Sequence, residues 1–300
     1  MVTLEERPCP ICKTSEHSVV FRQSTYDESR WTQASFSSRK VPEYMHFRFL
    51  TCGACGLTYG SPVASAESAS QAYHGASFEA TAESADAART YAGYLRKQDF
   101  EPGSALDIGC ADGAFLRELR RLGFHQVVGV EPSEAPVRVA AGDVRPLIRQ
   151  EMFDGARFAE NSFDLVTCFQ TIEHVYEPRA LLEDIFRILK PGGKVFLIGH
   201  DLGAFSARVM GQKSPIFDIE HVQLFNPRSV RFLLARTGFR AVNVFPILNA
   251  YALTYWVKLF PLPVRVKSTL LAWFERPPLR ALGAVRIPVP AGNMAIFGTK

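Results

Sequence analysis

Four of the six cysteines stand in two pairs whose spacing suits a bound metal ion. Cys9 and Cys12 form the first C-x-x-C pair, and Cys52 and Cys55 form the second. Two intervening residues let both sulfurs of one turn reach the same tetrahedral ion, and four thiolates fill its coordination shell. We therefore expect these four residues to bind a structural zinc ion. Redox-active pairs or free thiols are the alternative interpretation.

A second segment with chemical potential is the turn Asp107–Gly113. An apolar stretch ends there in an acid, Gly109 permits close approach of the backbone to a ligand, and Gly113 permits close contact between a helix and a strand. A nicotinamide enzyme would need G-x-G-x-x-G at this place to hold pyrophosphate, and the turn lacks that pattern. Its carboxylates instead suit a cationic amino-acid group. Glu131, at the end of the next apolar stretch, suits two ribose hydroxyls.

Alternating strands and helices must position these residues from Gly103 onward. Apolar runs bounded by turn residues predict strands at 105–109, 127–131, 147–149, 164–169, 194–199, 242–245 and 294–298. Helices are predicted at 114–122, 135–141 and 180–190, and a further helix begins at Asn226-Pro227 and is ended by Gly238. Regular alternation predicts an α/β fold with a parallel sheet covered on both faces. Ligands bind to such sheets at the carboxyl ends of the strands.

In this order and at these spacings, the motifs resemble those of class I S-adenosylmethionine-dependent methyltransferases. Leu106–Gly113 resembles the first motif, Gly129–Ser133 the second, and Phe163–Val175 with Leu189–Gly193 the fourth and the one after it. The resemblance implies a Rossmann-like seven-stranded sheet that binds S-adenosylmethionine. It also implies a set of cofactor-binding residues, namely Asp107, Gly109, Cys110 and Gly113 at the methionine and ribose end, Glu131 at the ribose, and the backbone around Phe169 and Gln170 at the amino group.

The chain departs from this family pattern at two places. The family usually has glycine where Ala111 stands, and alanine is tolerated there unless the backbone is left-handed. The family also carries an acid near position 152, where this chain has Met152 and Phe153. We expect one of these two side chains to cover the adenine face, with Asp154 or a backbone group reaching the exocyclic nitrogen.

The cysteine pairs extend the resemblance to enzymes of sugar and polysaccharide modification. The segment Phe49–Tyr59, placed before a methyltransferase core, resembles bacterial enzymes of this kind with an N-terminal zinc-binding domain. The resemblance implies methyl transfer to oxygen, or alternatively carbon, of a sugar, glycan or related small metabolite. One alternative is an rRNA-base methyltransferase in which the zinc module grips nucleic acid, but such enzymes have a more compact metal spacing and this module is not notably basic. Another is a non-catalytic scaffold that binds the cofactor.

Three histidines follow predicted strands or precede a helix where a transferable methyl group should point. A neutral imidazole suits removal of a proton from an acceptor hydroxyl. We rank His221 first as the catalytic base, His200 second and His174 third. Packing against neighbouring loops is the alternative role for each of them.

The chain divides into four predicted parts: a zinc-ribbon module at 1–62, a helical connector at 63–100, the methyltransferase core at 101–250 and a basic amphipathic segment with the last strand at 251–300. The connector should carry Tyr73, Phe78 and Tyr91 toward a core; a disordered linker is the alternative. The last fifty residues hold seven Lys or Arg against Glu275, a balance of +6, so the rest sums to −2. This segment is interpreted as a lid or accessory helix, or alternatively as a peripheral contact with anionic lipid.

The sequence contains no run of about 18 uncharged apolar residues that would suggest a membrane-spanning helix. Its polar and acidic start, Met1–Arg7, does not resemble a secretory signal. We therefore expect a cytoplasmic protein, with peripheral contact at the inner face of the membrane as an added possibility for the basic segment.

Overall fold

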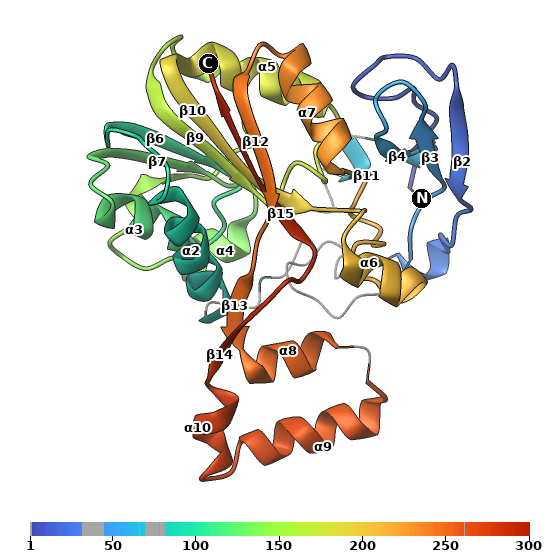
Figure 1. The fold of residues 1–300 in the computed structure, drawn as a ribbon, viewed down its shortest axis with the longest axis vertical. Helices are drawn as coiled ribbons and strands as arrows, with labels where there is room; N and C mark the ends of the chain where they lie inside the picture. Colours follow the sequence, from blue (N-terminus) through green and yellow to red (C-terminus); the bar gives the residue numbers. More distant parts are fainter. Residues whose placement is uncertain (1, 32–44, 66, 70–77, 79–81, 261) are drawn as a thin grey trace.

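The computed structural model describes residues 2–31, 45–65, 67–69, 78, 82–260 and 262–300. Tyr73, which we expected in the connector, lies outside the described residues. A seven-stranded sheet forms the centre of the chain, in the order β12-β15-β10-β9-β6-β7-β8 (Figure 1). Its strands are β6 (Ser104–Ile108), β7 (Gln126–Val130), β8 (Ile148–Arg149), β9 (Phe163–Phe169), β10 (Leu189–His200), β12 (Arg240–Pro246) and β15 (Asn293–Thr299).

The strands of this sheet run parallel except for β15, which is antiparallel to both β10 and β12. The predicted α/β fold class with a Rossmann-like seven-stranded sheet is therefore confirmed, and each predicted strand is present to within a few residues. Because β6, β7, β9 and β10 are parallel, their carboxyl ends meet at one edge of the sheet. The residues that follow these strands therefore lie close together.

Helices cover both faces of the sheet (Figure 1). One face packs against α5 (Pro178–Ile188) and α7 (Pro227–Arg236), and the other against α2 (Ala82–Leu95) and α3 (Ala114–Arg121). Alternate residues of one strand serve the two cores, since Leu197 joins the first and Phe196 the second. The start of α7 follows the predicted signal, because the Asn226 side chain accepts a hydrogen bond from the Ser229 N–H in a capping box. Shorter helices are α4 (Glu134–Val139) and α6 (Phe205–Met210), with 3-10 turns at Glu28–Arg30, Arg145–Leu147, Gly155–Arg157 and Gly211–Lys213.

The N-terminal module is joined to the core through a shared sheet. Its strands β2 (Ser18–Arg22), β3 (Phe49–Cys52) and β4 (Thr58–Gly60) pair in the order β11-β4-β3-β2, and β11 (Gln223–Leu224) belongs to the core. A further pairing, of β1 (Leu4–Glu5) with β5 (Val63–Ala64), crosses the predicted boundary at residue 62. The module is therefore anchored to the chain segment that leads into α7.

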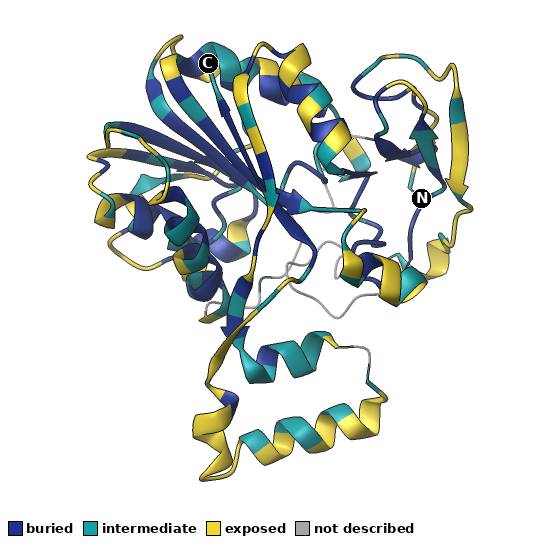
Figure 2. Cartoon of the chain, in the orientation of Figure 1, coloured by how far each residue is buried: buried dark blue, intermediate teal, exposed yellow. Residues whose placement is uncertain are grey.

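A three-helix insertion separates β12 from β15. Strands β13 (Asn249–Ala252) and β14 (Arg286–Val289) pair antiparallel and form a ribbon that carries α8 (Leu253–Leu259), α9 (Val264–Phe274) and α10 (Leu279–Gly283). We call residues 249–289 the helical arm. It projects from the body of the molecule, and most of α9 and α10 is exposed (Figures 1 and 2). Among the described residues, no helix is long and apolar enough to cross a membrane.

The buried guanidinium of Arg7 holds the module against the core. Its side chain donates to the carbonyls of Gly60, Tyr176 and Val222 at 2.5–2.9 Å and to the Gln223 side chain at 3.0 Å. Gly60 belongs to the module, whereas the other three acceptors belong to the core. Burial lowers the pKa of Arg7 to about 10, so the group stays charged at neutral pH.

We predict that Arg7→Ala lowers the free energy of unfolding by about 3 kcal/mol or more, because hydrogen bonds from a charged donor contribute about 1.5–3 kcal/mol each. Urea denaturation measures the change. Arg48→Ala is the matched control, since Arg48 is more exposed and, within the described residues, its side chain bonds to Ser61 and Glu6 of the module itself. Equal losses for the two variants would contradict a role for Arg7 in docking.

Candidate functional site

The four predicted zinc ligands converge at one end of the module. The sulfurs of Cys9, Cys12, Cys52 and Cys55 all lie within 4.8 Å of one another. The sulfurs of Cys9 and Cys55 are 3.6 Å apart, and those of Cys12 and Cys52 are 3.8 Å apart. A tetrahedral zinc ion with bonds of about 2.3 Å places its sulfurs about 3.8 Å apart. The geometry therefore fits a four-thiolate zinc site.

The two cysteine pairs are held by matching turns. The Lys13 N–H donates to the Cys9 carbonyl and the Gly56 N–H to the Cys52 carbonyl, both at 2.8 Å. Each donor directly follows the second cysteine of its pair, and both have positive φ, 60° for Lys13 and 78° for Gly56. The same local fold thus presents both pairs of sulfurs, which explains the two-residue spacing.

The predicted cofactor turn follows β6 at the carboxyl edge of the sheet. Asp107 is buried and accepts a hydrogen bond of 2.6 Å from the Thr167 hydroxyl of β9. Gly109 has a φ of 74°, and a Cβ there would lie 2.5 Å from the Thr171 hydroxyl, so glycine is required. Ala111 also has positive φ, 48°, and its N–H donates to the Glu131 carboxylate at 3.1 Å. The departure at Ala111 therefore falls on a left-handed position, where alanine is strained.

Seven of the nine predicted cofactor-binding residues line one cavity of about 1130 Å³. They are Asp107, Gly109, Cys110, Glu131, Met152, Phe169 and Gln170. Gly113, the eighth, is not one of the residues that line the cavity. It is the N-cap of α3 and has a φ of 73°.

The ring of Phe153 does not line the cavity, although it was one of the two side chains expected to cover the adenine. Its ring stacks on Phe158, with centroids 5.9 Å apart, and packs against the core. Asp154 is likewise turned toward its own loop, because its carboxylate accepts the Ala156 N–H at 3.0 Å. Met152 is 54% exposed and lines the cavity, so it is the side chain of this loop that is available to an adenine ring.

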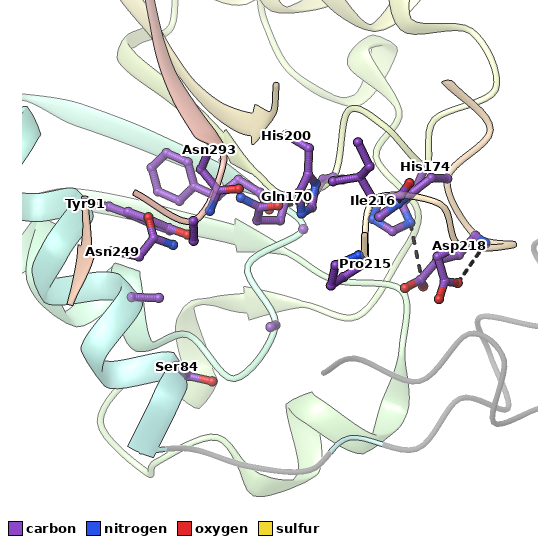
Figure 3. Close-up of a pocket in the computed structure, with 18 of the residues that line it drawn as sticks. Ser84, Tyr91, Gln170, His174, His200, Pro215, Ile216, Asp218, Asn249 and Asn293 are labelled. Carbon is purple, nitrogen blue, oxygen red and sulfur yellow. Dashed lines mark hydrogen bonds and ion pairs between the residues drawn. The ribbon is translucent and has the colours of Figure 1, made fainter. Parts of the chain in front are cut away.

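The three predicted histidines also line the cavity, where they come together from three segments. The ring centroid of His221 lies 4.9 Å from that of His174 and 5.0 Å from that of His200. In Figure 3, Asn249 and Asn293 lie on one side of Gln170 and His200, and His174 lies on the other. The cavity thus joins the cofactor turn to a cluster of imidazoles.

Each imidazole has a different partner. The Nδ1 of His200 lies 2.7 Å from the carboxylate of Glu173, and the Nδ1 of His221 lies 2.8 Å from the Ile216 carbonyl. His174 lies 3.7 Å from the carboxylate of Glu220. A carbonyl or carboxylate partner at Nδ1 assigns the proton to that atom and leaves Nε2 of His200 and His221 able to accept a proton.

Burial and charge act in opposite directions on Glu173. Complete burial by itself would raise its pKa, but the hydrogen bond to His200 and the nearby imidazoles outweigh burial and lower the pKa to about 2. Glu173 is therefore ionised at neutral pH. The pKa of His221 is lowered, chiefly by burial and then by the neighbouring His200.

Two buried polar atoms of residues that line the cavity have no partner within the described part of the chain. They are Gln170 Nε2 and Asn249 Oδ1. Gln170 also has a strained φ of 50° at the end of β9. Unpaired buried groups are costly, so a ligand that bonds to them would bind favourably.

Sequence reasoning missed Glu173 as the partner of His200 and the amides Asn249 and Asn293 in the cavity wall. Asp201 is not bonded to its neighbour His200, since its carboxylate accepts the Gly203 N–H at 2.8 Å. The position of Glu173 after a buried strand was a usable signal.

The order of the seven strands, with β15 antiparallel, and the cavity at the carboxyl ends of the parallel strands are those of a Rossmann-like class I methyltransferase. Residues 81–244, more than half of the chain, match the family model described as a methyltransferase domain. The chain therefore belongs to this family, and the predicted resemblance is confirmed.

Relatives and solved structures agree with this assignment. The chain is 36% identical over 121 residues to ubiquinone biosynthesis O-methyltransferase of Xanthomonas oryzae, a match covering 38% of this chain and 50% of the relative. The corresponding protein of Pseudomonas aeruginosa is 36% identical over 117 residues, which is 35% of this chain and 49% of that protein. The chain thus spans about half the length of these curated relatives. The YcgJ protein of Bacillus subtilis shares the fold, with a TM-score of 0.50 and 16% identity over 71% of this chain and 98% of that one.

We predict that Asp107→Asn stabilises the ligand-free protein at about pH 8 by a few kcal/mol and has no effect at about pH 4. Burial first, and the charge of Glu131 second, raise the pKa of Asp107 to about 7 from an ordinary value of 3.8. Folding therefore favours the protonated form of Asp107. The free energy of unfolding falls as the pH rises from the ordinary pKa of 3.8 toward the folded-state pKa of about 7.

Urea denaturation at the two pH values measures the difference. Asp143→Asn is the control, because Asp143 is exposed and its pKa is lowered by Arg117, so its loss should not stabilise the protein. An Asp107→Asn variant that is no more stable than the parent at the higher pH would contradict the raised pKa of Asp107.

Proposed function

We propose that this protein binds S-adenosylmethionine and transfers its methyl group to an oxygen atom of a small acceptor. The observation that carries the proposal is the single cavity that joins the carboxylates of Asp107 and Glu131 to the imidazole of His200. Its volume of about 1130 Å³ exceeds the range of about 300–1,000 Å³ common for single-ligand pockets. A cofactor and an acceptor can therefore occupy it together.

The cofactor half of the cavity favours a positively charged nucleoside. Asp107 and Glu131 are both buried, and burial raises the pKa of each, so a nearby cation would stabilise their ionised forms. Glu131 is held in place by the N–H groups of Ala111 and Ser133, at 3.1 and 2.8 Å, and we assign it to the ribose hydroxyls. When bound, S-adenosylmethionine supplies a methyl group activated by a sulfonium.

In the acceptor half, we assign proton removal to His200. Its Nδ1–H is directed at the ionised Glu173, which fixes the ring and stabilises the imidazolium that forms when Nε2 takes the acceptor's hydroxyl proton. His221 was ranked first from sequence, but it is 5% exposed and its Nδ1 faces an uncharged carbonyl. We therefore place His200 before His221 and His174. Glu173 acts through His200 as a positioning residue.

The acceptor is proposed to be a sugar, glycan or related small metabolite with a hydroxyl group. Aromatic side chains line the outer cavity at Tyr251, Tyr255 and Trp256, beside the amides of Asn249 and Asn293. Flat apolar rings pack against the face of a sugar or an aromatic ring, and amides bond to hydroxyls. The two relatives named O-methyltransferases support oxygen as the acceptor atom. A phenolic hydroxyl is the second candidate, because those relatives are named for ubiquinone biosynthesis.

Incubation with labelled S-adenosylmethionine and fractionated extract of the source cell tests the proposal, because transfer labels the acceptor. With that acceptor, we expect His200→Ala to lower kcat about a hundredfold to ten-thousandfold, the usual range for a lost general base. Cofactor affinity measured by calorimetry should not change, and His125→Ala, at an exposed position, is the control. Absence of cofactor binding by the unaltered protein would refute the proposed function.

Glu173→Gln separates positioning from structural support. Removal of the negative charge should lower kcat, because a neutral amide no longer stabilises the imidazolium that forms on His200, while cofactor affinity and the KM for the acceptor should change little. A variant that loses kcat and cofactor affinity together would show that Glu173 only supports the fold.

We also propose that Cys9, Cys12, Cys52 and Cys55 bind a structural zinc ion. Their sulfur–sulfur distances support this, and four thiolates leave no open position for substrate. We expect metal analysis to find one zinc ion per chain. Cys52→Ala should abolish zinc binding and lower the melting temperature, because metal binding contributes to folding.

Cys168→Ala is the matched control for the zinc prediction. Cys168 is equally buried but lies in β9, away from the cluster, so its loss should leave the zinc content unchanged. Full zinc occupancy in Cys52→Ala would exclude the proposed site.

A further inference from the structure

The helical arm exposes an unusual amount of apolar surface. Of the seventeen large hydrophobic residues that are exposed in the described part of the chain, eight lie between residues 260 and 287. They are Phe260, Val264, Val266, Trp273, Leu279, Leu282, Val285 and Ile287. Only Tyr255 and Gly283 are buried among the described residues of α8, α9 and α10. So many exposed apolar side chains on one projecting segment indicate a contact with another body.

The same arm carries a net charge of +5, which exceeds the net charge of +4 of the whole chain. The arm has six basic residues and one acid, Glu275, and the basic residues are Lys258, Arg265, Lys267, Arg276, Arg280 and Arg286. Arg286 is neutralised by the buried Asp86 at 2.6 Å, whereas Arg265, Arg276 and Arg280 are exposed. Apolar and basic side chains alternate along one exposed helix, α9, which begins with Val264, Arg265 and Val266. This combination complements a surface that is both apolar and anionic.

The apolar surface continues to the mouth of the cavity. Phe260 of the arm is 61% exposed and lines the cavity, and so do Phe205 and Val209 of α6, which are 81% and 66% exposed. Trp256 and Leu259 of α8 line the same wall. The arm and α6 therefore flank the opening through which an acceptor must enter.

We propose that the helical arm is a docking surface for an anionic lipid bilayer. Its exposed apolar side chains enter the headgroup region, and Arg265, Arg276 and Arg280 lie against anionic headgroups. Contact is peripheral, since no described helix is long enough to cross a bilayer. Docking places the mouth of the cavity at the lipid surface. If the proposed function holds, the acceptor is a hydroxyl compound with a lipid tail.

Sedimentation of the full chain with vesicles tests this surface without cofactor or acceptor, so its result is independent of the methyl-transfer assay. We expect binding to vesicles of equal parts phosphatidylcholine and phosphatidylglycerol, weak binding to pure phosphatidylcholine, and a decline as salt rises. Each basic residue near an anionic surface contributes about 1 kcal/mol, so Arg265→Glu with Arg276→Glu should weaken binding about thirtyfold or more.

Two matched controls keep the test specific. Arg236→Glu with Arg240→Glu reverses two exposed charges on α7 and β12, outside the arm, and should leave binding nearly unchanged. Val264→Ser with Trp273→Ser should weaken binding, whereas Val19→Ser with Val20→Ser, on exposed β2, should not. Circular dichroism checks that each variant is folded.

Three results would overturn the proposal. They are equal binding to the two kinds of vesicle, no binding to either, and binding to anionic vesicles that persists when Arg265 and Arg276 are both reversed. The last result would also follow if another face of the molecule bound lipid.

Discussion

Three carboxylates are buried at the carboxyl edge of the sheet, and the cost of removing them from water determines what the cavity can hold. Glu173 is compensated by His200, so its pKa falls to about 2. Within the described part of the chain, the hydrogen bonds to Asp107 and Glu131 come from neutral donors, so burial raises the pKa values of both carboxyls. One half of the cavity therefore favours a cationic ligand, while the other has a His200 imidazole that is hydrogen-bonded to Glu173 and can accept a proton at Nε2.

Local signals were sufficient for the central sheet and its helices. Asn226 is the N-cap of α7 and Pro227 is its first residue, so the pair marks the start of the helix. The turn after β6 has left-handed backbone at two positions, and glycine stands at both of them, Gly109 and Gly113. The pairing of β11 with β4 was not predictable, because a two-residue strand has no periodicity and depends on contacts far along the chain. The β13–β14 ribbon was missed for the same reason.

The cofactor turn was predictable because its residues are contiguous and their spacing is fixed by one strand and one helix. The pair formed by Glu173 and His200 was not, since it depends on the register that places Phe169 of β9 beside Ile198 of β10. An acid adjacent in sequence to a histidine does not indicate such a pair, because neighbouring side chains diverge. Phe153 was assigned to the cavity by its loop position, but the apolar ring gains more from stacking on Phe158.

The ribbon that bears the helical arm brings Asn249 and Val289 directly opposite each other. The helical arm is therefore an insertion whose two ends lie side by side. Segments of this kind tolerate changes in length and composition without disturbing the elements that flank them. We therefore expect the helical arm to accept insertions and deletions that the strands holding the turn after β6 would not.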